Sequence, residues 1–186
     1  MRFAKLTLTT RRLPGLTATG AALLALSACS SSSLPTLSGF DAVRAQAART
    51  EAAASERATQ LAEAAPERAS CSAALRSVAS ASHERLEALG GLWDPWGGAV
   101  PEGESAPAAV SEAPTDVSAY VSWLARTATR DLEIAANPDK TSAEEARTLG
   151  ASALGRYAGA ARLAYVYGID LEAGDDAALL INDRVN

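Results

Sequence analysis

Residues 141–168 read TSAEEARTLGASALGRYAGAARLAYVYG, a run rich in alanine, leucine, arginine and glutamate, which all favour the α-helix. Its opening, Thr141-Ser142-Ala143-Glu144-Glu145, places either hydroxyl three residues before a glutamate, which is the capping-box pattern of a helix start. The run ends at Gly168, and glycine is common just past the last helical turn. Apolar residues recur every three or four positions between these ends, which predicts one buried face: Leu149, Ala153, Leu154, Tyr157, Ala161, Ala164 and Tyr165.

Three glycines interrupt this helix at Gly150, Gly155 and Gly159. Each costs about 1 kcal/mol relative to alanine inside a helix, so a close crossing by another helix is expected to compensate. The spacing of Gly155 and Gly159 also occurs where helices pair inside membranes. Because Arg156 and Arg162 lie beside them, we favour a close contact within a water-soluble bundle.

The chain before residue 141 carries three more helical segments, each bounded by residues that start or stop a helix. The first covers 40–65 and consists mostly of strong helix formers. The second covers 66–89, begins at a proline and is stopped by Gly90-Gly91. The third is capped by Asp116 and ended by Asn137-Pro138.

Composition and pattern together predict an all-α protein. The 186 residues include 44 alanines, and only 5% of the chain is aromatic. No alternation of apolar and polar residues is long enough for a strand. Residues 90–115 contain four prolines and are predicted to form a long loop, and residues 175–185 a short last helix. We therefore predict an Ala-rich antiparallel bundle of four to five helices over residues 40–186.

The amino-terminal 28 residues differ from the rest of the chain. They contain Arg2, Lys5, Arg11 and Arg12 and no acidic residue, followed by an apolar run over 16–26. This run is too short for a permanent membrane span, and the pattern is that of a secretory signal. The Arg11-Arg12 pair leaves both the general and the twin-arginine export routes open.

The signal ends in Leu26-Ser27-Ala28-Cys29, which resembles the lipobox of bacterial lipoproteins at all four positions. The resemblance implies cleavage between Ala28 and Cys29, a diacylglyceryl group on the Cys29 thiol, and acylation, typically by palmitate, of the new amino terminus. The alternative is an ordinary signal peptide in which the cysteine stands by chance. Two or more acyl chains hold a protein on a bilayer effectively permanently. The resemblance thus predicts a lipid-anchored protein on the extracytoplasmic side of the cell membrane, in the cell envelope.

Cleavage would leave a chain quite unlike the precursor. Residues 29–39 would be the lipidated cysteine and a flexible tether, with Ser30–Ser33 at its start. Removal of residues 1–28 leaves 158 residues with 13 of the 17 basic and all 22 acidic side chains, a formal charge of −9. Such an acidic domain is not expected to bind nucleic acid.

The helix order over 40–168 resembles that of ferritin-like helical proteins of bacterial envelopes. That fold holds two metal ions with Glu-x-x-His motifs on two helices. Here His83 is the single histidine and Ser80 stands where the motif needs glutamate, so we predict no metal site and no cofactor. We expect His83 to be exposed and to contact Glu87.

Sequence motifs for catalysis are absent. No serine lies in G-x-S-x-G, no pair of cysteines forms C-x-x-C, and no glycine-rich phosphate loop follows a strand. Cys71 lies in phase with the apolar stripe of the second helix, so we expect a small buried side chain. No catalytic residue is predicted.

The loop contains the stretch Gly91-Leu92-Trp93-Asp94-Pro95-Trp96-Gly97-Gly98, with two of the three tryptophans of the chain. Exposed aromatic rings on a loop are typical of partner or ligand contacts, which makes Trp93 and Trp96 candidates for such a role. The favoured alternative is that both rings fold back and close one end of a core that is poor in large side chains.

Three functions are compatible with these features. The favoured one is a membrane-anchored envelope lipoprotein whose bundle is a non-enzymatic interaction or structural domain, with an envelope protein as its partner. The second is a ferritin-like bundle that binds a ligand or metal. The third is an envelope enzyme with no recognisable motif.

Overall fold

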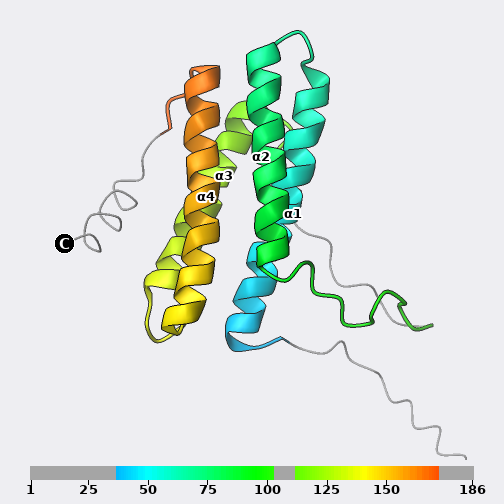
Figure 1. The fold of residues 1–186 in the computed structure, drawn as a ribbon, viewed down its shortest axis with the longest axis vertical. Helices are drawn as coiled ribbons and strands as arrows, with labels where there is room; N and C mark the ends of the chain where they lie inside the picture. Colours follow the sequence, from blue (N-terminus) through cyan, green and yellow to red (C-terminus); the bar gives the residue numbers. More distant parts are fainter. Residues whose placement is uncertain (1–36, 103–111, 172–186) are drawn as a thin grey trace, which may run out of the picture. The chain divides into compact units, whose positions relative to one another are not determined.

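The computed structural model describes residues 37–102 and 112–171. These residues form four α-helices and no strand, so the predicted all-α class is confirmed, with four helices in the described part (Figure 1). The helices are α1 (Gly39–Ala64), α2 (Ala69–Ala88), α3 (Val117–Ala136) and α4 (Ala143–Tyr167). The predicted signal, Cys29, the tether up to residue 36 and the predicted helix 175–185 lie outside the described residues.

The predicted caps of α3 and α4 are present. The Asp116 carboxylate accepts a hydrogen bond from the Ala119 N–H at 2.9 Å. At α4, the Ser142 N–H donates to Glu145 Oε2 at 2.7 Å, and the Glu145 N–H donates back to the Ser142 hydroxyl at 3.4 Å, a complete capping box. Gly168 ends α4 with a φ of +65°. Local sequence therefore determines these helix ends.

The start of α2 differs from the prediction, because the helix begins at Ala69 and not at Pro66. The residue before a proline avoids helical dihedrals, and Ala65 indeed has φ −131° and ψ 57°. The chain uses Pro66 and Glu67 for the turn that reverses its direction between α1 and α2.

The four helices form an antiparallel bundle built from two hairpins, α1–α2 and α3–α4, which meet mainly where α2 packs on α4. One apolar cluster joins the start of α1 and α4 to the end of α2 and α3. A second cluster joins the opposite ends of all four helices. The connection between α2 and α3 therefore carries the chain from one end of the bundle back to the other (Figure 1). One long crossover of this kind is the connectivity of ferritin-like bundles.

Close packing of α2 against α4 accounts for two of the three glycines in α4. A Cβ atom on Gly159 would lie 3.4 Å from Val78 Cγ2, and one on Gly155 would lie 3.1 Å from Cδ of Arg85. The expected close crossing is thus present. Gly150 is less crowded, since its nearest neighbour would be the Ala135 Cβ at 3.9 Å.

The buried face of α4 is rotated from the predicted one. Leu154 and Tyr165, both predicted to face inward, are 46% and 89% exposed. The inward positions are taken instead by Ser152 and Arg156, together with leucine and alanine residues. The physical reason is that Arg156 and Ser152 are buried by hydrogen bonds to Glu51, which the spacing of apolar residues does not indicate. In the part of the chain described, no helix is long and apolar enough to span a membrane.

Candidate functional site

Charged side chains lie at the centre of the bundle. Among residues 37–102 and 112–171, the buried charged side chains are Glu51 of α1, Asp131 of α3 and Arg156 of α4. The partly buried Arg85 of α2 also reaches this centre. We call these four residues the ionic cluster; it draws one side chain from each helix.

Arg156 joins the two acids of the ionic cluster. Its Nε and Nη2 atoms donate to Glu51 Oε1 at 3.1 and 2.9 Å, and its Nη1 atom donates to Asp131 Oδ2 at 2.9 Å. Its guanidinium side chain is 0% exposed. Since a buried charge is tolerated only when paired and hydrogen-bonded, this geometry explains how three charges occupy an alanine core.

Glu51 is held from α2 as well. Arg85 Nε donates to Glu51 Oε1 at 3.1 Å, and Arg85 Nη2 lies 3.0 Å from Oε2 and donates to the Ser82 hydroxyl at 2.9 Å. The Ser152 hydroxyl donates to Glu51 Oε1 at 2.9 Å. The N···O distance to Oε2 is that of an ion pair, but its angles are not those of a hydrogen bond. The carboxylate of Glu51, on α1, is therefore bound by side chains from both α2 and α4.

Asp131 has a second cation at the edge of the bundle. Arg130 Nε and Nη2 donate to Asp131 Oδ1 at 3.0 and 2.8 Å, and the Arg130 side chain is 43% exposed. Both carboxylates are thus paired with guanidinium groups, which outnumber them three to two.

Tyr120 lies next to the ionic cluster. Its hydroxyl donates to the Ala54 carbonyl at 2.7 Å, and its ring stacks on Trp123 with centroids 6.1 Å apart. Burial, and then the negative charge of Glu51, raise the pKa of the Tyr120 hydroxyl well above its usual range. The neutral tyrosine is thus part of the core.

The ionic cluster does not fit the metal centre of a ferritin-like bundle. Such a centre needs several inward carboxylates and histidines that are free to bind metal. Here Glu51 and Asp131 are bound by Arg156, and no group of three or more His, Cys, Asp or Glu side chains in the described ranges could hold a metal ion. The described helices thus share one long crossover with such bundles, but not a set of side chains free to bind metal.

His83 and Cys71 of α2 both lie as the sequence predicts, the first exposed and the second buried. His83 is exposed, with Nε2 3.4 Å from Glu87 Oε1 one turn along α2. Cys71 is buried and forms no disulfide. Burial and the nearby Cys71 raise the pKa of the Tyr167 hydroxyl.

The tryptophan loop, residues 90–102, follows α2 at the end of the bundle where α1 begins (Figure 1). The N–H groups of Gly90 and Gly91 bond the carbonyls of Glu87 and Leu86 at 2.9 Å, a Schellman end in which both glycines have positive φ. Arg44 Nη1 donates to the Leu89 carbonyl at 3.4 Å. The chain therefore turns away from the helix axis directly after Leu89.

Trp93 and Trp96 are partly buried, but neither belongs to the two apolar clusters. The expected closure of the core by these rings is wrong, because Leu89, 2% exposed, takes that place and the glycines then redirect the chain. The tryptophan that packs on the core is Trp123. In the loop, the Asp94 carboxylate accepts from the Trp96 N–H at 2.9 Å, which forms a turn around Pro95.

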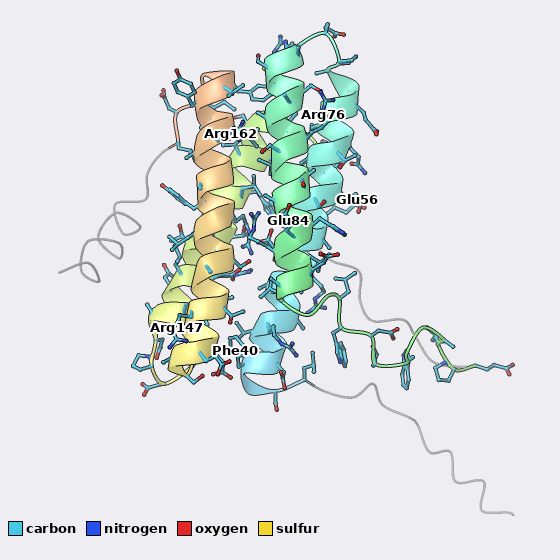
Figure 2. The ribbon with its side chains drawn as sticks, viewed as in Figure 1. Phe40, Glu56, Arg76, Glu84, Arg147 and Arg162 are labelled. Atoms are coloured by element: carbon cyan, nitrogen blue, oxygen red, sulfur yellow. The ribbon has the colours of Figure 1, made fainter. Side chains whose placement is uncertain are left out.

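The loop and the start of α1 border a hollow that is open to solvent. A pocket of ≈ 310 Å³ is lined by Leu37 and Arg44 on one side and by Leu92, Trp93 and neighbouring loop residues on the other. Figure 2 labels Phe40 of α1 and Arg147 of α4 at this same end of the bundle. The first described residues thus lie beside the tryptophan loop.

No protein-family model matches this chain, and no curated protein or solved structure matches it significantly.

Proposed function

We propose that this chain is a lipid-anchored protein of the bacterial cell envelope that works by binding and not by catalysis. In this proposal Cys29 carries the lipid, residues 30–38 link it to α1, and Trp93 and Trp96 contribute a contact surface. The domain would lie on the extracytoplasmic side of the cell membrane.

The single observation that carries the proposal for the folded domain is the position of the tryptophan loop. Its two rings lie outside both apolar clusters, with Leu92 54% exposed beside them. Large apolar side chains at a surface are typical of contact sites. The lipid anchor is supported by the agreement of basic start, apolar run, lipobox and serine segment in the sequence.

The buried acids support a binding role over catalysis. Glu51 and Asp131 are enclosed by guanidinium groups and helices, with 0% and 2% of their side chains exposed. General acid or base catalysis requires a group within hydrogen-bond reach of a substrate. The ionic cluster is better suited to holding the four helices together.

The two cysteines of the chain provide a matched test of the anchor. In cells fed a labelled fatty acid, the wild type and Cys71→Ser should become labelled, whereas Cys29→Ala should remain unlabelled and unprocessed. Mass spectrometry of the mature wild-type protein should find Cys29 as the first residue, carrying lipid. An unmodified mature amino terminus would refute the proposal.

A further inference from the structure

We propose that the tryptophan loop lies in the headgroup region of the lipid bilayer, so that the domain contacts the membrane at a second point besides its anchor. This inference rests on the proposed lipid on Cys29 and names the partner of the contact surface formed by Trp93 and Trp96. The residues concerned are Leu92, Trp93, Trp96 and Val100.

The first argument is the length of the chain between the anchor and the bundle. Leu37 follows Cys29 by eight residues, which span at most about 28 Å when fully extended. Leu37 and Trp93 line the same pocket. A lipid on Cys29 would therefore keep this end of the bundle, and the tryptophan loop with it, close to the bilayer surface.

The second argument is the chemistry of the loop. Leu92 and Val100 are 54% and 47% exposed, and Asp94 is the single charged residue between Leu89 and Pro101. Tryptophan is the residue that accumulates at membrane interfaces, because its ring is apolar and its N–H can donate. The Trp96 indole N–H is buried without a hydrogen-bond partner among the described residues, an unfavourable state that an acceptor in the headgroup region would relieve.

The acidic side chains near the tryptophan loop indicate which lipid headgroups it contacts. Asp94 and Glu102 lie in the loop and Asp41 lies beside it, with Arg44 as the nearby cation. Anionic headgroups would repel this end of the bundle, whereas a zwitterionic surface would not. The occupant is therefore a zwitterionic lipid interface, entered by apolar contact.

Quenching of tryptophan fluorescence by brominated lipid tests this contact. The lipidated full-length mature protein is reconstituted into phosphatidylcholine vesicles with bromine on the acyl chains. Trp123→Phe leaves the two loop tryptophans as the emitters, and the matched variant Trp93→Phe/Trp96→Phe leaves Trp123. We expect quenching at least threefold stronger in the first variant than in the second, with a shift of its emission to shorter wavelength.

The outcomes are distinguishable. Lipid on Cys29 with equal quenching in the two variants overturns the loop contact and leaves the anchor standing. Loop tryptophans that are shielded in native membranes but not quenched in vesicles also overturn it, because they indicate a protein partner. Unmodified Cys29 in the mass spectrum overturns the anchor and this inference together. Addition of anionic lipid to half of the total should weaken the quenching; a stronger signal would contradict the zwitterionic preference.

Discussion

Arg156 is the residue whose substitution we expect to affect stability most, because its charged side chain is completely buried. Its guanidinium lies between Glu51 and Asp131, entirely out of solvent. Removal of one partner from such a buried pair leaves an uncompensated charge, and that loss is larger than the net value of the pair.

Arg156→Met should therefore destabilise the protein by about 3–5 kcal/mol, because Glu51 and Asp131 lose their shared partner. Arg162→Met is the matched control: it lies on the same helix, is exposed, and should change the unfolding free energy by less than about 0.5 kcal/mol. Urea denaturation measures both. Equal stability of the two variants would contradict the role of the ionic cluster.

The raised pKa of Tyr120 predicts how the stability of the protein depends on pH. Its pKa in the folded protein is raised by burial and by Glu51, so its contribution is full below the ordinary tyrosine pKa of about 10 and is lost as the pH rises above it. The wild type should lose stability steeply above pH 10, and Tyr120→Phe should show a smaller loss. Tyr165→Phe, at a site 89% exposed, should keep the wild-type slope. Thermal melts from pH 8 to 11 provide the comparison.

The ionic cluster also shows where sequence reasoning stops. Glu51 and Arg156 lie in phase with buried alanines of their helices, and that phase was the available signal. A charged residue on a helix is usually solvated, so this phase alone does not predict that either side chain is buried. Their pairing depends on contacts between residues 105 positions apart, which the local pattern does not contain.

At the scale of the helices, the caps were predictable because they depend on neighbouring residues alone. Ser142 and Ser38 both occupy N-cap positions, but only the Ser142 hydroxyl accepts a hydrogen bond from the backbone of its helix. The two serines therefore isolate the value of a cap hydrogen bond.

Ser142→Ala should cost about 1 kcal/mol, since the Glu145 N–H loses its acceptor. Ser38→Ala should lower the unfolding free energy by no more than about 0.3 kcal/mol, because no side-chain hydrogen bond is lost. The difference in melting temperature between the two variants is the measurement. A larger loss for Ser38→Ala would show that the cap hydrogen bond is not the cause.

The glycines of α4 allow a second comparison within one helix. Gly150→Ala should stabilise the protein by about 0.5–1 kcal/mol, because the new Cβ would meet ordinary contacts and the helix propensity improves. Gly155→Ala should lose this gain and destabilise, since its Cβ would press on Arg85, which is held by Glu51 and Ser82. Chemical denaturation of both variants tests the sign of each effect.

At the scale of the whole molecule, the fold class and the order of the four helices followed from the sequence, whereas the position of the loop did not. The predicted core closure by Trp93 and Trp96 was wrong because the glycines after Leu89 turn the chain aside. Hydrophobicity alone does not indicate on which side of a turn a ring will lie.

The three tryptophans should accordingly differ in their effect on stability. Trp93→Ala/Trp96→Ala should lower the unfolding free energy by less than about 1 kcal/mol, because neither ring packs on the core clusters. Trp123→Ala should cost at least about 2 kcal/mol, since its ring packs on the core and on Tyr120. Calorimetry of the two variants gives the comparison. A larger loss in the double variant would restore the core-closing role of the loop.

The alanine-rich faces of these helices determine the alignment of the two hairpins only weakly, and the ionic cluster compensates for this. Alanine side chains are small and alike, so the alanine positions by themselves would distinguish poorly between alignments of the two hairpins that differ by one turn, about 5.4 Å. Such a slip would move Arg156 a full turn away from Glu51, leaving charges buried without partners. We therefore expect the central charges to favour a single alignment of the two hairpins, in addition to the contacts of Gly155 and Gly159 with α2.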